Sequence, residues 1–129
     1  MKKTLLKVVI ADDEPNILLS LEFLMKKAGY HVFIARDGSE AKEIIARESP
    51  HIVLLDIMMP EINGYELCQY IRASPELRST KIIFLSAKNK DSDREYGYQV
   101  GADLYIPKPF STRELMNKVN VLALGFSLR

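Results

Sequence analysis

The sequence has very little cysteine and histidine, and no tryptophan. Its 129 residues include one cysteine, Cys68, and two histidines, His31 and His51. A single cysteine excludes a disulfide framework and a multi-cysteine zinc site, and the widely spaced histidines make no metal-ligand pair. Cys68 falls inside a predicted helix beside apolar residues, so we expect a buried or half-buried structural thiol. Together these absences indicate a reduced domain, and we expect a cytoplasmic protein.

Long apolar runs and an excess of either charge are also absent. No run approaches the roughly 18 apolar residues that a membrane span needs, and the start of the chain does not resemble a signal peptide. The chain has 18 basic and 17 acidic residues, for a net charge of +1. That balance argues against a broad nucleic-acid surface. We therefore expect neither a membrane contact nor direct nucleic-acid binding.

Short apolar runs alternate with longer amphipathic ones. The short runs are nearly continuous in hydrophobicity, as parallel strands covered on both faces need to be. The longer ones carry helix start and stop signals, such as Pro15 and Gly29 around the first. The predicted strands are Leu6–Ala11, Val32–Ala35, Ile52–Leu55, Ile82–Leu85 and Leu104–Ile106, and the predicted helices are Pro15–Ala28, 37–47, Asn63–Arg72, Asp91–Val100 and one that starts with a capping box at Ser111.

This pattern predicts an α/β fold. Five βα units imply a doubly wound, five-stranded parallel sheet with strand order 2-1-3-4-5, as in flavodoxin-like folds. The length is typical of one domain, so we expect residues 1–129 to form a single domain with a core at about 5–122. Residues 123–129 are expected to be a tail or the start of a linker. In the predicted helix Asp91–Val100, Gly97 and few apolar anchors make this the element that we expect to move.

Polar groups follow four of the predicted strands. The first strand is followed by the acidic run 12–14, the third by Asp56, the fourth by Ser86 and the fifth by Lys108. In the order 2-1-3-4-5 these strands are neighbours, so their carboxyl ends meet at one edge of the sheet. A single polar group at a strand end is typical of ordinary surface, but four that converge indicate a functional site.

The residue types indicate the chemistry of this site. Crowded carboxylates repel each other by about 4 kcal/mol per close pair at an effective dielectric near 20. A hard divalent cation such as Mg²⁺ relieves that repulsion. A lysine and a hydroxyl beside the cation could hold phosphoryl oxygens. Asp56 stands alone in the middle of the edge and is the best-placed nucleophile for forming an acyl phosphate.

Four stretches of the chain resemble the receiver domain of two-component response regulators. The resemblance runs from about Leu5 to Leu122, with every element in order, and four motifs at the right spacings are highly specific. The stretches are Val9–Pro15, Leu54–Pro60 followed by Gly64, Leu85–Ala87 and Gly101–Phe110.

The resemblance implies a role for each residue at the predicted edge. Asp56 would be the phosphoacceptor and Lys108 the phosphate-binding lysine, followed by a cis peptide bond before Pro109. Ser86 would be the switch hydroxyl and Tyr105 the switch aromatic residue.

The resemblance also implies a Mg²⁺ site. Asp12 and Asp13 would form its acidic pair, with Asp13 the more direct ligand. Asp56 would contribute its carboxylate and Met58 its backbone carbonyl.

The resemblance implies a signalling switch that does not turn over a substrate as an enzyme does. A sensor histidine kinase or a phosphotransfer protein would supply the phosphoryl group, which the domain would transfer to itself and lose slowly. Phosphorylation would change the face formed by the helix 91–100, the strand 104–106 and the helix after Ser111. That face would control a partner or output domain, and we expect it to form a phosphorylation-dependent homodimer.

Two alternatives come from other functional classes. An aspartyl-phosphate phosphohydrolase of the haloacid-dehalogenase type needs an acid two residues past its nucleophile, where this chain has Met58. A receiver-like scaffold that is never phosphorylated would have no need of all five site residues.

Overall fold

One parallel sheet forms the centre of the protein. The computed structural model describes residues 6–88 and 90–127. In that part of the chain the sheet has five strands in the order β2-β1-β3-β4-β5, all parallel. The predicted fold class is therefore confirmed. The strands are β1 (Lys7–Ala11), β2 (His31–Ala35), β3 (Ile52–Asp56), β4 (Lys81–Ser86) and β5 (Leu104–Pro107).

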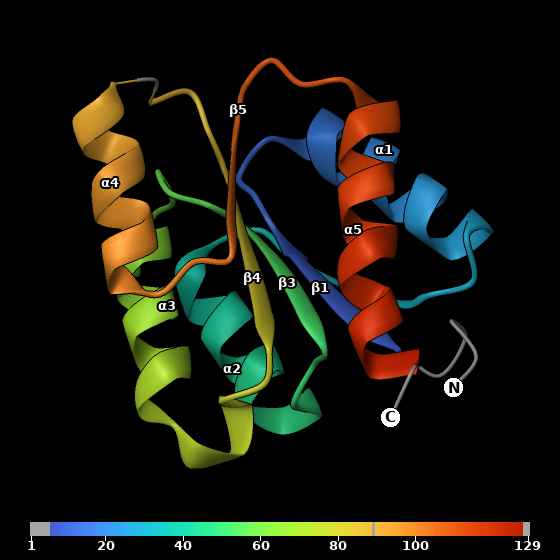
Figure 1. Cartoon of the computed structure of the whole chain (residues 1–129), viewed down its shortest axis with the longest axis horizontal. Helices are drawn as coiled ribbons and strands as arrows, with labels where there is room; N and C mark the ends of the chain where they lie inside the picture. Colours follow the sequence, from blue (N-terminus) through green and yellow to red (C-terminus); the bar gives the residue numbers. More distant parts are fainter. Residues whose placement is uncertain (1–5, 89, 128–129) are drawn as a thin grey trace.

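Helices cover both faces of the sheet (Figure 1). On one face lie α1 (Pro15–Lys27) and α5 (Thr112–Ser127), which pack on a core that includes Leu21 and Val119. The opposite face is covered by α2 (Gly38–Glu48), α3 (Gly64–Ala73) and α4 (Asp91–Val100). A short 3₁₀ helix, η2 (Pro75–Leu77), connects α3 to β4. Both layers exclude water from the sheet, which is why all five residues of β3 are buried.

Local capping signals position the helices. Asp37 accepts a hydrogen bond from the backbone N–H of Glu40 at the start of α2, at 2.8 Å. Asn63 and Glu66 form a reciprocal capping box at the start of α3. At the start of α5 the hydroxyl of Ser111 accepts from the N–H of Glu114 at 3.3 Å. These short-range bonds end the strand-to-helix loops at defined residues and so hold the loops at the carboxyl edge of the sheet.

The last helix extends beyond the core boundary that we expected near residue 122. It continues to Ser127 and buries Ala123 and Phe126. The ring of Phe126 packs edge-on against His51, with ring centroids 5.1 Å apart. Ala123 and Phe126 therefore belong to the core, whereas Leu124 between them is exposed.

Gly97 has a different role from the one expected. It is buried, and a Cβ built at this position would lie 2.9 Å from Tyr105 Cδ2 and 3.2 Å from Phe84 Cδ2. The glycine therefore lets α4 pack closely on the edge of the sheet, so it marks a close contact where the sequence indicated a weak helix.

Two further expectations can be compared with the backbone. The peptide bond between Lys108 and Pro109 is cis, as the resemblance implied. Within residues 6–88 and 90–127, no helix combines the length and apolar character needed to cross a membrane.

Candidate functional site

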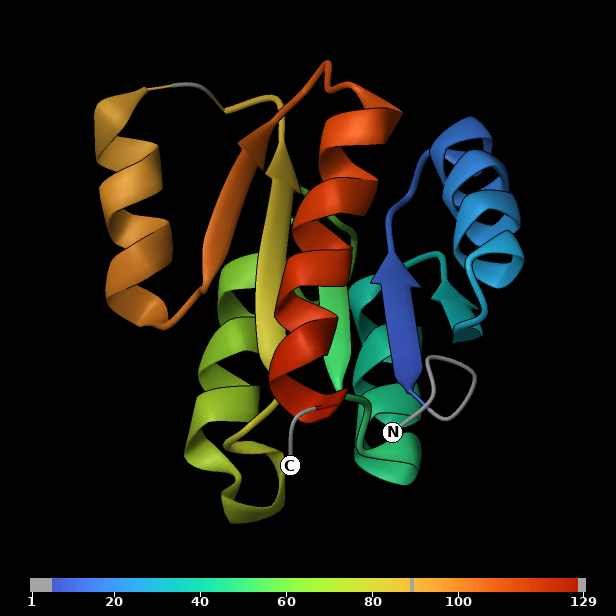
Figure 2. The ribbon, with the colours of Figure 1, turned by 45° about the vertical axis from the view of Figure 1, so that its right-hand side comes forward.

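The register of the sheet brings four strand ends together. Ala11 is paired with Leu55, Asp56 with Leu85, and Ser86 with Pro107. The residues that follow these positions therefore lie at one edge, where all the strands point (Figure 2). The N–H of Lys108 also donates to the carbonyl of Ser86 at 2.7 Å. The predicted convergence of polar groups is present in the structure.

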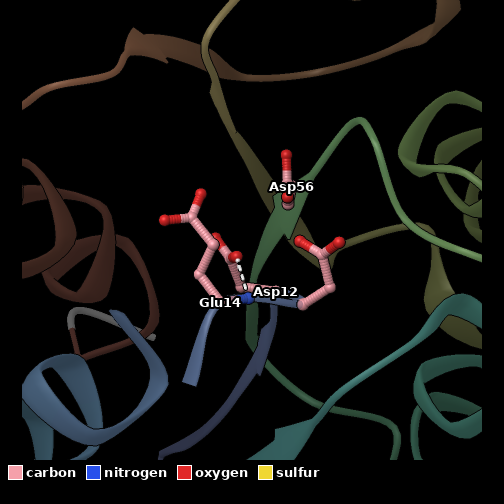
Figure 3. A group of neighbouring side chains, drawn as sticks. Asp12, Glu14 and Asp56 are labelled. Atoms are coloured by element: carbon pink, nitrogen blue, oxygen red, sulfur yellow. Dashed lines mark hydrogen bonds between the residues drawn. The ribbon is translucent and has the colours of Figure 1, made fainter. Parts of the chain in front are cut away.

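Four carboxylates gather at this edge. One oxygen from each of Asp12, Asp13, Glu14 and Asp56 lies within 4.8 Å of those of the other three. Asp12 and Asp56 are buried, whereas Asp13 and Glu14 are exposed. Figure 3 shows Asp12, Glu14 and Asp56 at the ends of β1 and β3, with the 2.9 Å hydrogen bond from the N–H of Glu14 to Asp12 Oδ1. Glu14 belongs to this cluster although the sequence reasoning did not assign it a role at the site.

One ammonium group, that of Lys108, lies beside three of the four carboxylates. Lys108 Nζ lies 2.9 Å from Asp12 Oδ2, 3.0 Å from Glu14 Oε1 and 3.6 Å from Asp56 Oδ2. Burial alone would lower the pKa of Lys108, but its bonds to Asp12 and Glu14 outweigh burial, so the pKa is raised. Lys108 is therefore held as a cation beside Asp56.

Asp56 ionises less readily than an ordinary aspartate. Burial, followed by the charge of Asp12, raises its pKa to about 7, and the Lys108 ammonium and the N–H of Met58 offset this only in part. Its Oδ1 accepts that N–H at 3.2 Å, which orients the carboxylate. Added positive charge at the site would favour the ionised, nucleophilic form of Asp56.

The acidic cluster has the donors that a divalent cation prefers. Hard cations bind carboxylate oxygens, and four carboxylates against one ammonium leave an excess of negative charge. Asp12 Oδ2 is buried and accepts no well-aligned hydrogen bond from the described residues, although Lys108 lies close to it. A buried carboxylate oxygen that is offset only by an ammonium shared with other carboxylates has a strong free-energy reason to bind a further cation. The residues therefore fit a divalent metal, and Glu14 adds a fourth carboxylate to the predicted set.

The hydroxyl of Ser86 is buried and ordered by the loop after β4. Its Oγ accepts the N–H of Lys88 at 3.0 Å, and the carbonyl of Lys88 accepts the hydroxyl of Tyr105 at 2.8 Å. The ring of Tyr105 is only 5% exposed and packs edge-on against Phe84. Tyr105, which the resemblance implied to be the switch aromatic residue, therefore occupies an inward position in this structure.

Other candidate residues lie away from this edge. His31 begins β2 and is exposed, and His51 precedes β3, where its Nδ1 accepts the N–H of Lys7 at 3.0 Å. Both are at the amino edge, as expected. Cys68 is fully buried in α3, and burial raises the pKa of its thiol to about 11. The thiol therefore has a structural role.

Two pockets flank the acidic cluster. One, of about 530 Å³, is lined by residues of α1 and of the loop after β5, including Glu14 and Lys108. The other, of about 450 Å³, lies on the other side and is lined by residues that include Asp13, Met58, Tyr65 and Lys88. Small molecules and water can therefore approach the site from two directions.

Known sequences and structures are similar to this chain. The sequence profile of the family described as "Response regulator receiver domain" matches residues 8–120. The receiver domain of the Francisella response regulator 1452 is 33% identical, with a TM-score of 0.84 over 90% of this chain and 94% of its own. The BeF3-activated N-terminal receiver domain of Klebsiella pneumoniae RstA is 30% identical, with a TM-score of 0.81 over 89% and 96%.

A third similar structure comes from a kinase. The signal receiver domain of a signal transduction histidine kinase from Syntrophus aciditrophicus is 29% identical, with a TM-score of 0.85 over 92% of this chain and 90% of its own. The family match covers most of the chain, including all four strand ends of the site. The chain therefore belongs to the response regulator receiver domains, a family of signalling phosphoacceptors.

Proposed function

We propose that this protein is a signalling switch that accepts a phosphoryl group on Asp56 from a sensor histidine kinase or a phosphotransfer protein, with Mg²⁺ as cofactor. One observation carries the proposal. The buried Asp56 carboxylate ends the central strand 3.6 Å from the Lys108 ammonium, within a cluster of four carboxylates. This arrangement supports the proposal, because a nucleophile, a cationic group and metal ligands are what phosphoryl transfer needs at one point.

The transfer itself is a simple exchange of bonds. An oxygen of Asp56 forms a bond to phosphorus while the phosphorus–nitrogen bond of the donor phosphohistidine breaks, and the electron pair leaves on the imidazole nitrogen. Lys108 binds a phosphoryl oxygen and offsets its charge. Asp12, Asp13 and Asp56, together with the backbone carbonyl of Met58, would hold Mg²⁺. The metal would stabilise charge on the phosphoryl oxygens.

Ser86 and Tyr105 would transmit the structural effect of the phosphoryl group to the surface of the protein. The Ser86 hydroxyl lies at the end of the strand next to Asp56 and can donate its proton to a phosphoryl oxygen. Any movement of Ser86 pulls on Lys88, because the Lys88 N–H binds Ser86 and the Lys88 carbonyl binds Tyr105. We propose that this path changes the α4-β5-α5 face and so controls a partner or output domain.

Labelling by a small-molecule donor tests the proposal. We expect acetyl phosphate with Mg²⁺ to add the mass of one phosphoryl group to the intact protein. A chelator should prevent the reaction, and Asp56→Asn should abolish it. Asp91→Asn changes an exposed aspartate at the start of α4 and should be labelled as the wild type is.

Three other outcomes would indicate a different phosphoacceptor residue or a different function. Undiminished labelling of Asp56→Asn would show that another residue accepts the phosphoryl group. Continuous release of phosphate, without a stable adduct, would indicate a phosphohydrolase. No labelling of the wild-type protein under any of these conditions would indicate a scaffold.

A further inference from the structure

Met58 is an exposed thioether beside the phosphorylation site. Its side chain is 60% exposed, whereas the adjacent Met59 is only 7% exposed and Met25 is fully buried. The N–H of Met58 donates to Asp56 Oδ1 at 3.2 Å. Met58 also lines the pocket of about 450 Å³ that contains Asp13 and Lys88. A large apolar side chain is thus left in solvent two residues from the nucleophile.

We propose that Met58 is a site of reversible oxidation by peroxides, and that its sulfoxide shortens the lifetime of the phosphoryl group on Asp56. In the reaction, the sulfur lone pair attacks one oxygen of hydrogen peroxide, the O–O bond breaks, and a sulfur–oxygen bond forms. Proton transfer then completes a molecule of water. Sulfur is oxidised by two electrons, the peroxide is reduced, and methionine sulfoxide reductases reverse the change.

Exposure makes Met58 the preferred target. Peroxide must reach the sulfur, and the side chains of Met25 and Met59 are shielded by the core. The thiol of Cys68 does not compete, because it is fully buried and the raised pKa keeps it protonated. Met116, on α5, is only partly buried. Its extent of oxidation relative to that of Met58 therefore measures how selective the reaction is.

Oxidation changes the chemistry of the pocket next to Asp56. A thioether is a weak hydrogen-bond acceptor, whereas a sulfoxide oxygen is a strong one. The ammonium of Lys88 lies on the same pocket, 4.0 Å from Asp93, and is not an acceptor. Asp13 and Asn63 line this pocket with acceptor oxygens, and Asp13 would be engaged by the metal in the proposed function. Neither Met58 nor Lys88, however, adds a strong acceptor that could orient a water molecule beside the aspartyl phosphate.

The backbone keeps the side chain of Met58 within reach of the pocket. Met58 is tied to Asp56 by its own N–H, and the next N–H, of Met59, donates to the carbonyl of Ile57 at 3.2 Å. The pocket has room for several water molecules, since one occupies about 30 Å³ in the liquid. A new acceptor here can hold a water for attack on phosphorus. The effect on phosphate loss rests on the proposed function, whereas the selective oxidation does not.

Peptide mapping and phosphate loss test the two parts separately. The wild-type protein is treated with hydrogen peroxide, and the oxidised methionines are quantified by mass spectrometry. We expect sulfoxide at Met58 well before Met25, Met59 or Met116. The phosphorylated protein, with and without that treatment, is then followed by intact mass as the phosphoryl group is lost.

We expect oxidation to speed phosphate loss about three- to tenfold, below the roughly hundredfold effect of a positioned general base. Methionine sulfoxide reductase should restore the original rate. In Met58→Leu, peroxide treatment should leave the rate of loss unchanged, whereas Met59→Leu should respond as the wild type does. Met58→Gln, which places an amide oxygen at a similar reach, should lose phosphate faster than Met58→Leu.

Three results would overturn the inference. Oxidation of a buried methionine before Met58 would exclude the site. An unchanged rate of phosphate loss in the Met58 sulfoxide would exclude its effect. An equal response of Met58→Leu and the wild type to peroxide would place the effect at another residue. If the untreated wild type were not phosphorylated at all, the proposed function would fail, while the map of sulfoxides would still decide the oxidation site.

Discussion

Ionisation of Asp56 opposes folding in the absence of a bound cation. Burial and the neighbouring Asp12 raise its pKa from 3.8 to about 7. Between these two values the folded protein binds more protons than the unfolded chain, so its free energy of unfolding falls as pH rises. The contribution is fully present below about pH 4 and is lost as pH rises through about 7. The buried Asp56 carboxylate therefore lowers the free energy of unfolding at neutral pH and above, and a bound cation would restore it.

We therefore predict that Asp56→Asn stabilises the cation-free protein at pH 8. An asparagine stays neutral, so the variant lacks the loss of stability that accompanies ionisation. We expect a gain of up to about 4 kcal/mol at pH 8 that falls to less than half of that at pH 5 and toward zero near pH 4, given about 1.4 kcal/mol per unit of the pKa shift. Urea unfolding at several pH values, in the presence of a chelator, gives both curves.

Comparing Asp56→Asn with the wild type cancels the contribution of His51 to the pH dependence of stability, which has the opposite sign. Burial lowers the pKa of His51, so this residue makes the folded state more stable as pH rises. Because both proteins retain His51, its contribution cancels in the difference. A difference in unfolding free energy that is the same at pH 5 and pH 8 would contradict the prediction.

The position of most site residues could be predicted from sequence, but their environment could not. Asp12, Asp56 and Ser86 follow buried strands, so the topology alone places them at one edge. Glu14 was predicted to lie at this edge as part of the acidic run 12–14, but only the geometry adds its carboxylate to the cation-binding cluster. The inward position of Tyr105 depends on a carbonyl 17 residues earlier in the chain, which no local pattern reveals.

At the scale of elements, α4 is held to the sheet by close contact. Gly97 lies against the rings of Tyr105 and Phe84, and Tyr65 packs edge-on against Tyr96 with ring centroids 4.7 Å apart. The sequence pattern correctly predicted the bounds of α4, Asp91–Val100. It could not distinguish a glycine that weakens a helix from one required by a neighbour, because both look the same in one sequence.

Alanine substitutions at two glycines distinguish a glycine that weakens its helix from one that a close neighbour requires. Helix propensity predicts that Gly→Ala stabilises a helix by up to about 1 kcal/mol. At Gly97 the added methyl would meet Tyr105 at 2.9 Å, so we predict a net loss of about 1–3 kcal/mol from overpacking. At Gly125 in α5 nothing lies within 4 Å of the added Cβ, and we predict a small gain.

Urea unfolding of both variants provides the measurement, each serving as the other's control. Stabilisation by Gly97→Ala comparable to that by Gly125→Ala would show that α4 is loosely packed. It would also support the original expectation that this helix is intrinsically weak.

For the whole molecule, the edge of the sheet at β5 is closed to strand addition. The N–H of Tyr105 donates to the hydroxyl of Tyr98 on α4 at 3.1 Å, and Pro107 has no N–H to offer. A partner on the α4-β5-α5 face would therefore bind through side chains. The exposed apolar residues on these helices are Tyr96, Tyr98, Val121 and Leu124, of which Val121 is the most exposed, at 65%.

The overall architecture was the most predictable level of the structure. Near-continuous apolar strands, separated by amphipathic helices, leave few alternatives to a doubly wound sheet. The end of α5 was the exception. The burial of Phe126 depends on its contact with His51 across the amino edge, and a contact between distant parts of the chain has no periodic signature.

The last prediction is that phosphorylation promotes dimerisation through the α4-β5-α5 face. This face has charges of both signs, including Arg94 and Glu114, which suits self-association about a two-fold axis. Exposed ion pairs alone contribute little, so an apolar contact must carry most of the affinity. Val121 borders a groove of about 310 Å³ beside Leu104 and is the residue best placed to supply it.

Sedimentation by analytical ultracentrifugation, with and without beryllofluoride and Mg²⁺, measures the association. We expect the activated wild type to dimerise and Val121→Asp to remain monomeric while still accepting a phosphoryl group from acetyl phosphate. Leu19→Asp places the same charge on an equally exposed apolar site of α1 and should dimerise normally. Loss of dimerisation in Leu19→Asp but not in Val121→Asp would move the interface to α1, because only a buried contact is sensitive to an introduced charge.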